Sequence, residues 1–130
     1  MYYHQPKNTY ISMLNSSLGE LSKNKIELLY ESVGTTSGIT FTVDFNMSDY
    51  KELLFVFSAT TGLSFPTFFT HTINTKMFDI FTSGSQIIRC YWDGSVCFGT
   101  MKYTKVSETS HKFALGGSEY KPKVYIYGVK

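Results

Sequence analysis

The sequence predicts an all-β protein, an antiparallel β-sandwich or jelly-roll-like domain with a short N-terminal helical segment. Aromatic residues make up 17% of the 130 residues, with 11 Phe and 10 Tyr, and such residues favour strands. From residue 25 onward, short runs that alternate apolar and polar residues are separated by turn residues about every eight to twelve positions, as in sandwiches. Asp93-Gly94 between two apolar runs is a strong short-range signal of a β-hairpin.

Residues 1–24 differ from the rest and are predicted to form an N-terminal extension, followed by a β-sandwich domain over residues 25–130. Apolar residues of the extension recur at spacings of three and four, which is typical of a helix with one apolar seam: Ile11, Leu14, Leu18 and Leu21. Two interpretations are open. In the first, the helix docks on its own domain. In the second, it forms the end of a helical stalk that joins identical chains around an axis.

The first predicted strands come from residues 26–31 and 39–45. In the second of these, apolar residues alternate with threonines and an aspartate, as in a strand with one face buried. The next run, KELLFVF, contains five consecutive apolar residues and is typical of a central strand covered on both faces. We therefore expect a core that includes Phe41, Val43, Phe45, Leu53, Phe55, Phe57 and Ile126.

The second half of the chain predicts shorter elements. Pro66 precedes residues 67–73, which indicates an edge or irregular strand. The remaining expected elements are a short strand at 77–81, a polar connection at 105–110, and strands at 112–115 and 123–129.

The stretch from Gln86 to Met101 is interpreted as a hairpin with Asp93-Gly94 as a two-residue type I′ turn. This register places Cys90 opposite Cys97, at a pair whose backbones are hydrogen-bonded. Side-chain directions at such pairs suit a disulfide less well, so we expect two reduced thiols. Both faces of the hairpin carry apolar residues, which predicts that a second sheet or another subunit covers its outer side.

Composition and motifs argue against several functions. The net charge of +2, with 12 scattered Lys and Arg, does not suit a nucleic-acid binder, and no run of about 18 apolar residues suits a membrane span. Three distant histidines and the absence of a phosphate-binding loop predict neither metal nor cofactor. A carboxylate pair for glycoside hydrolysis could come from Asp44, Asp49, Glu52 and Asp79, but a chain of this size contains such carboxylates by chance. We therefore expect no enzyme and no catalytic residues.

The candidate ligand-binding residues are Tyr91, Trp92 and Asp93, at the tip of the predicted hairpin. Aromatic faces stack on sugar rings, and an adjacent carboxylate accepts hydrogen bonds from sugar hydroxyls. The alternative is structural, with the only tryptophan of the chain packed at the end of the core.

Two segments carry a family resemblance. They are IELLYESVGTTSGITFTVDFNMSDYKELLFVF, with Ser48-Asp49-Tyr50 as its turn, and the final VYIYGVK, which ends in Tyr127-Gly128-Val129-Lys130. Both resemble small bacteriophage and prophage virion proteins of the tail-fibre, baseplate or receptor-binding-tip type. The resemblance implies a β-sandwich subunit of the virion, commonly a trimer, which binds a cell-surface saccharide or serves as an adaptor to other virion proteins. It supplies no catalytic residues.

The alternative function is a bacterial carbohydrate-binding module or a small sugar-active β-sandwich protein. A secreted module is expected to carry a signal peptide, and the start MYYHQPKNTY lacks the basic and apolar regions of one. We therefore expect a virion subunit that is synthesised in the host cytoplasm. Only 17% of the residues are charged, which favours contact with other protein, and we expect a homotrimer with the N-terminal apolar seam near its axis.

Overall fold

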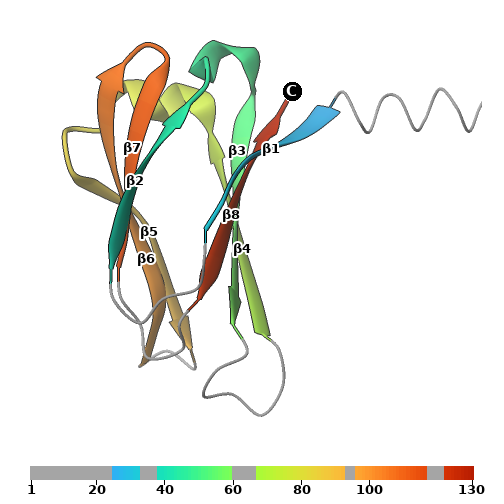
Figure 1. Cartoon of the computed structure of the whole chain (residues 1–130), viewed down its shortest axis with the longest axis vertical. Helices are drawn as coiled ribbons and strands as arrows, with labels where there is room; N and C mark the ends of the chain where they lie inside the picture. Colours follow the sequence, from blue (N-terminus) through green and yellow to red (C-terminus); the bar gives the residue numbers. More distant parts are fainter. Residues whose placement is uncertain (1–24, 33–37, 60–66, 93–95, 117–121) are drawn as a thin grey trace, which may run out of the picture.

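The structure is a computed structural model that describes residues 25–32, 38–59, 67–92, 96–116 and 122–130, with backbone only for residues 67, 91, 92 and 96–98. Within these residues the protein is all-β, with eight strands in two four-stranded antiparallel sheets. The sheets pack face to face (Figure 1), so the predicted sandwich class is confirmed at this level. The predicted N-terminal helical segment lies outside the described residues.

We call the two sheets A and B. In order across the sheet, sheet A contains β1 (Ile26–Glu31), β8 (Lys123–Val129), β3 (Glu52–Ala59) and β4 (Thr67–Asn74). Sheet B contains β2 (Ile39–Asp44), β7 (Ser110–Leu115), β6 (Val96–Ser107) and β5 (Ser85–Trp92). Two 3-10 helices, η1 (Met47–Asp49) and η2 (Thr75–Asp79), lie at one end of the sandwich together with the β6–β7 turn (Figure 1).

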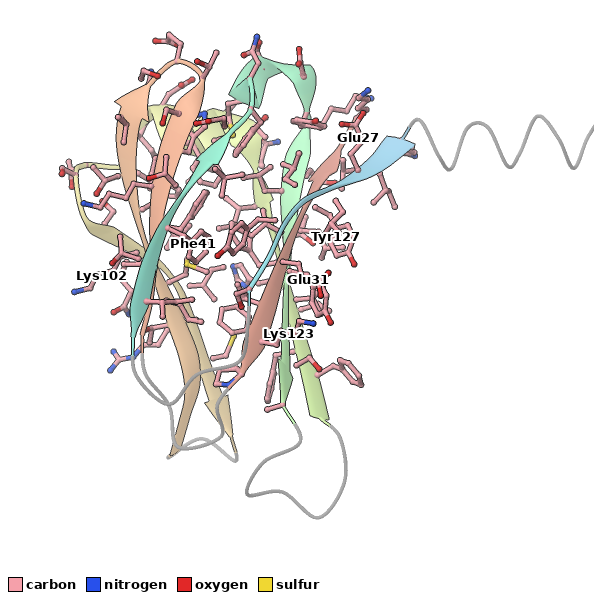
Figure 2. All side chains as sticks on the ribbon, viewed as in Figure 1. Glu27, Glu31, Phe41, Lys102, Lys123 and Tyr127 are labelled. Atoms are coloured by element: carbon pink, nitrogen blue, oxygen red, sulfur yellow. The ribbon has the colours of Figure 1, made fainter. Side chains whose placement is uncertain are left out.

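The core lies between the sheets and comes from every second residue of their strands. In β3 the burial alternates along the whole strand: Leu53, Phe55 and Phe57 are completely buried, and the residues between them are half-buried on the outer face of sheet A. Of the predicted core residues, Phe41 is half-buried and points between the sheets (Figure 2), where it packs against the core. The others are buried, as predicted: Val43, Phe45, Leu53, Phe55, Phe57 and Ile126.

The predicted edge strand after Pro66 is confirmed. β4 lies at an edge of sheet A and pairs with β3 along its whole length, from Glu52 with Asn74 to Ala59 with Thr67. Pro66 itself lies outside the described residues.

The prediction of a strand at residues 77–81 is wrong, because residues Thr75–Asp79 form the 3-10 helix η2. Asn74 begins the helix, since its Oδ1 accepts a hydrogen bond of 2.9 Å from the N–H of Lys76. The buried residues of η2 are Thr75 and Phe78, three positions apart. This spacing suits a 3-10 turn, whereas a strand would have buried every second residue.

The predicted polar connection at residues 105–110 is also wrong. β6 continues to Ser107 and β7 begins at Ser110, so only Glu108 and Thr109 separate the two strands. Side chains at this end of β6 are exposed, and the strand continues because its backbone pairs with β7, as Lys105 does with His111. The polar side chains of Lys105 and Ser107 therefore indicate that this part of β6 is exposed to solvent, and they do not mark the end of the strand.

The β5–β6 hairpin is present, but its register differs from the prediction. The strands are already shifted by one residue at Trp92, and a bulge between Cys90 and Tyr91 shifts them by one more. The predicted turn residues Asp93-Gly94 lie outside the described residues. The observed pairs are Trp92 with Val96, Tyr91 with Cys97 and Cys90 with Gly99. Cys90 and Cys97 therefore do not lie opposite each other. The ring of Phe57 in sheet A covers Gly99, where a Cβ would lie 2.6 Å from Cδ2 of the ring. At this level of the sandwich the ring of one sheet therefore lies against a glycine of the other, and a side chain at position 99 would need the ring to move.

Candidate functional site

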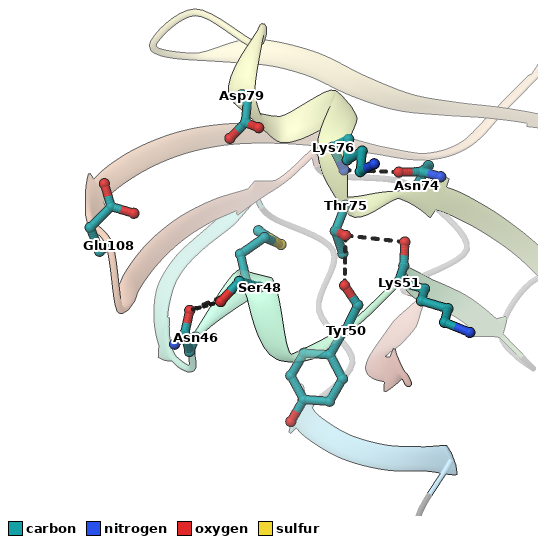
Figure 3. A pocket seen from close by; sticks show the side chains of 10 residues that line it. Asn46, Ser48, Tyr50, Lys51, Asn74, Thr75, Lys76, Asp79 and Glu108 are labelled. Atoms are coloured by element: carbon teal, nitrogen blue, oxygen red, sulfur yellow. Dashed lines mark hydrogen bonds between the residues drawn. The ribbon is translucent and has the colours of Figure 1, made fainter.

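A cleft of about 550 Å³ opens at the end of the sandwich where η1, η2 and the β6–β7 turn come together (Figure 3). This volume lies in the range of about 300–1,000 Å³ that is usual for small-molecule sites. Most residues that line the cleft are polar or charged, although apolar atoms, including those of their side-chain stems, contribute about half of its surface. The lining residues are Asn46, Met47, Ser48, Tyr50, Lys51, Asn74, Thr75, Lys76, Asp79 and Glu108. The cleft therefore suits a ligand with many hydrogen-bonding groups.

Asn46 and Ser48 form the part of the cleft that belongs to η1. The Oδ1 of Asn46 accepts two hydrogen bonds from Ser48, at 3.2 Å from its N–H and at 2.9 Å from its hydroxyl. An asparagine before a helical turn is favoured because its short side chain reaches the first unpaired N–H groups. Since Oδ1 is engaged, Asn46 offers a ligand its Nδ2 hydrogens, and the Ser48 oxygen offers lone pairs.

Asn74 has the same role at η2, on the opposite side of the cleft (Figure 3). Its Oδ1 accepts from the N–H of Lys76, and its Nδ2 hydrogens remain available to a ligand. The two asparagines thus present donors whose positions are set by their capping bonds.

Thr75 is buried at the base of the cleft and joins η2 to the beginning of β3. Its hydroxyl oxygen lies 2.7 Å from the carbonyl oxygen of Tyr50 and 3.1 Å from that of Lys51. The N–H of Thr75 also donates to the Lys51 carbonyl, at 2.9 Å. The two connections that carry the asparagines are therefore tied together by direct bonds.

Tyr50 links the cleft to the edge strand of sheet A. Its ring is buried against Gly128, where a Cβ would lie 2.5 Å from ring atoms, and its hydroxyl donates to Oε2 of Glu27 at 2.6 Å. Burial, together with this hydrogen bond, raises the pKa of Tyr50 to about 12. The other oxygen of Glu27 pairs with Lys130 at 2.6 Å, and this bond lowers the pKa of Glu27.

Four charged side chains line the cleft, and they divide by sign. Lys51 and Lys76 lie on one side, and Asp79 and Glu108 lie on the other (Figure 3). Glu108 pairs with Lys105 at 2.8 Å, and this hydrogen bond lowers the pKa of Glu108. The side-chain charges of Lys51, Lys76 and Asp79 form no ion pair with any residue that the structure describes.

His111 supports the cleft through Phe45, the residue before Asn46. It is 1% exposed, with Nε2 3.0 Å from the carbonyl oxygen of Phe45 and Nδ1 2.7 Å from the hydroxyl of Tyr103. Because a carbonyl only accepts, Nε2 carries the hydrogen and Tyr103 donates to Nδ1. Burial lowers the pKa of His111. Both ring nitrogens are engaged, so this histidine positions the cleft wall and does not contact a ligand.

Of the residues predicted to bind a ligand, only the backbone of Tyr91 and Trp92 is described, and it lies away from this cleft (Figure 1). The backbone of Tyr91 and Trp92 forms the last part of β5, while their side chains and Asp93 lie outside the described residues. The hairpin end of β5 and β6 lies at the opposite end of the sandwich from η1 and η2 (Figure 1). The predicted interface residues Ile11, Leu14, Leu18 and Leu21 also lie outside the described residues.

Sequence reasoning missed most of the cleft. Of the four carboxylates named as a possible glycosidase pair, Asp79 lines the cleft. The other three, Asp44, Asp49 and Glu52, are not among its lining residues. An asparagine two residues before a turn N–H is a recognisable capping signal, and it occurs at both Asn46 and Asn74. The signal predicts two turns, but only the sheet order brings the turns together.

The described residues contain no group of three or more His, Cys, Asp or Glu side chains that is arranged to hold a metal ion. In the same part of the chain, no helix is long and apolar enough to cross a membrane. Comparisons of the chain with protein-family models, with curated proteins and with solved structures find no match.

Proposed function

We propose that this protein is a virion attachment subunit, a jelly-roll-like sandwich that binds a host cell-surface glycan without converting it. The virion part of the proposal is supported by the resemblance of roughly residues 26–60 and 122–130 to phage tail-fibre, baseplate and receptor-binding-tip proteins. The glycan part is supported by one structural observation, the hydrogen-bonding capacity of the end cleft.

Each hydroxyl of a saccharide both donates and accepts, so a glycan site needs donors and acceptors side by side. In the cleft, the Nδ2 groups of Asn46 and Asn74 donate, and the oxygens of Ser48 and Asp79 accept. The capping bonds hold both amides in place before a ligand arrives. Such preorganisation lowers the entropy cost of binding.

The carboxylates of the cleft support binding and not hydrolysis. A glycosidase needs a general acid whose pKa is raised by its surroundings. Glu108 has the opposite environment, because its side chain is 88% exposed and its bond to Lys105 lowers its pKa. We therefore propose no catalytic residue here.

The outer face of sheet A supports assembly into an oligomer. The rings of Tyr125 and Tyr127 stack there with centroids 6.3 Å apart, and Leu54 lies beside Tyr127 in the register of β3 and β8. At the margins of this face, Leu28 is 51% exposed and Phe68 is 62% exposed. Apolar faces of this kind mark protein contacts. In the proposed homotrimer, neighbouring subunits or other virion proteins cover part of this face.

The glycan proposal is tested by screening immobilised bacterial cell-surface glycans and then titrating a hit into ¹⁵N-labelled protein. We expect shift changes at η1, η2 and the β6–β7 turn. Asn74→Asp keeps the capping oxygen but replaces the amide donor, so it should weaken binding about tenfold, as expected for a lost hydrogen bond in a polar site. The matched control is Asp44→Asn. The Asp44 side chain is exposed at the end of β2 and does not line the cleft, so this variant should bind normally. Shift changes confined to other surfaces would contradict the proposal.

A further inference from the structure

We propose that the ligand of the end cleft is zwitterionic, a saccharide that carries both an anionic and a cationic group, such as an amino sugar phosphate. The saccharide part of this inference rests on the proposed function. The charge part rests on the distribution of charged side chains around the cleft.

The charges of the cleft are separated in space and largely unpaired. Lys76 and Asp79 are three residues apart in η2, a spacing at which the side chains of a 3-10 helix lie above one another. Despite this spacing they form no ion pair, and they extend to different sides of the cleft (Figure 3). At the edge of the same cleft, Lys105 and Glu108 have the same sequence spacing and do pair, at 2.8 Å, so Glu108 is the one charged lining residue with a partner among the described residues. The cleft therefore keeps a cationic and an anionic side apart.

Some other charged side chains of the described residues form ion pairs, whereas Lys25, Asp44, Asp49, Glu52, Lys102 and Lys112 form none with a described residue. Glu27 pairs with Lys130, and Glu31 pairs with Lys123 on the outer face of sheet A (Figure 2). What distinguishes Lys51, Lys76 and Asp79 is therefore their position, because these unpaired charges of both signs line one cleft. A ligand with complementary charges would complete these contacts.

The charge arrangement also predicts which ligands are rejected. A purely anionic sugar would pair with Lys51 and Lys76 but would face Asp79 and Glu108, and a purely cationic sugar would meet the reverse. A neutral sugar would bind by hydrogen bonds alone and would gain no charge-assisted contact from either the cationic or the anionic side of the cleft. Only a ligand with both charges uses the whole cleft without repulsion.

The experiment compares four matched monosaccharides by NMR titration at low salt and about pH 6, where an amino group is protonated. The probes are glucosamine 6-phosphate with both charges, glucose 6-phosphate with the anion, glucosamine with the cation, and glucose with neither. We expect glucosamine 6-phosphate to bind at least about tenfold more tightly than each of the other three, as one charge-assisted hydrogen bond supplies.

Single-charge variants identify the two sides. Lys76→Gln should abolish the preference for glucosamine 6-phosphate over glucosamine, and Asp79→Asn should abolish its preference over glucose 6-phosphate. Lys102→Gln is the control, because Lys102 is exposed on the outer side of sheet B (Figure 2) and should leave all four affinities unchanged. Chemical shifts of β3 and β6 amides report whether each variant keeps its fold.

The outcomes separate this inference from the proposed function. Equal binding of glucose and glucosamine 6-phosphate would overturn the zwitterion inference and leave the glycan function standing. Equal binding of glycylglycine, a zwitterion without sugar hydroxyls, would support the charge arrangement but overturn the saccharide ligand. No shift change at the cleft with any probe or any immobilised glycan would overturn both.

Discussion

Tyr103 donates a hydrogen bond of 2.7 Å to Nδ1 of His111 in the interior of the sandwich, where both side chains are almost completely buried. The same imidazole donates from Nε2 to the carbonyl of Phe45. Burial, with a smaller contribution from the carboxylates of Asp79 and Glu108, raises the pKa of Tyr103 to about 12, so its hydroxyl stays protonated. The arrangement is complete only while His111 is neutral.

We therefore predict that the protein loses stability between pH 7 and about pH 5 because of His111. Burial lowers the pKa of His111 in the folded state, so below its ordinary value of about 6.5 the unfolded chain binds the proton first. The stabilisation is full above that value and is lost as the pH falls toward the folded-state pKa. Urea unfolding at both pH values measures this change.

The control for this prediction is His111→Gln. The variant should be less stable at neutral pH, because a buried network is broken, but its stability should vary less between the two pH values. Glu27 and Glu108, whose pKa values are lowered, lose their contributions only at more acidic pH and do not confuse the comparison. A variant with the wild-type pH dependence would exclude His111 as the cause.

Phe55→Ala should destabilise the protein by about 3–5 kcal/mol, the usual cost of truncating a buried phenylalanine. Phe55 is completely buried and packs edge-to-face on Phe113 of the other sheet, with ring centroids 5.9 Å apart. Leu54→Ala, one residue away on the outer face of β3, is the matched control and should cost less. Equal losses in the urea midpoint would mean that the assigned inner face is wrong.

Gly128→Ala should cost about 1–3 kcal/mol through overpacking, because the ring of Tyr50 occupies the space of the new methyl group. The cause is tested by repeating the substitution in a Tyr50→Ala background. There the ring is absent, and we expect the additional cost of Gly128→Ala to fall markedly. Additive losses in this double-mutant cycle would assign the effect to the backbone of β8 and not to Tyr50.

Deleting residues 1–22 should convert the proposed trimer into smaller species, measured by light scattering. The reason is that the apolar residues Ile11, Leu14, Leu18 and Leu21 are proposed to lie near the axis. If the truncated chain still formed an oligomer with the same number of subunits, the sandwich faces would be what holds the oligomer together. A full-length chain that is monomeric at micromolar concentration would contradict assembly and favour the isolated carbohydrate-binding module.

Thiol titration of unfolded, unreduced protein should find two thiols per chain, at Cys90 and Cys97. The observed register supports this expectation in a new way, because it pairs Cys90 with Gly99 and Cys97 with Tyr91. The two residues are therefore not directly cross-strand, the arrangement that a bridge between adjacent strands most often uses. Finding no thiol would show that a disulfide forms despite this register.

The sequence by itself determined the strands whose side chains alternate and the core that they build. In residues 39–45 a residue's neighbours along the chain already reveal its face, because apolar residues alternate with threonines and an aspartate. Val43 and Phe45 could be placed in the core for this reason, whereas the unbroken apolar run of β3 did not distinguish its inner face from its half-buried outer face. The pattern is local, and so a single sequence is sufficient to read it.

Only the tertiary structure decided the register of the β5–β6 hairpin and the composition of the cleft. The observed register places Gly99 under the ring of Phe57, which comes from a strand about forty positions away in the other sheet. The cleft depends on the order of the strands, which brings Asn46, Asn74 and Glu108 from three separate connections to one end of the sandwich. These contacts join residues distant in sequence, and neither alternation nor turn chemistry carries information about which distant residues will meet.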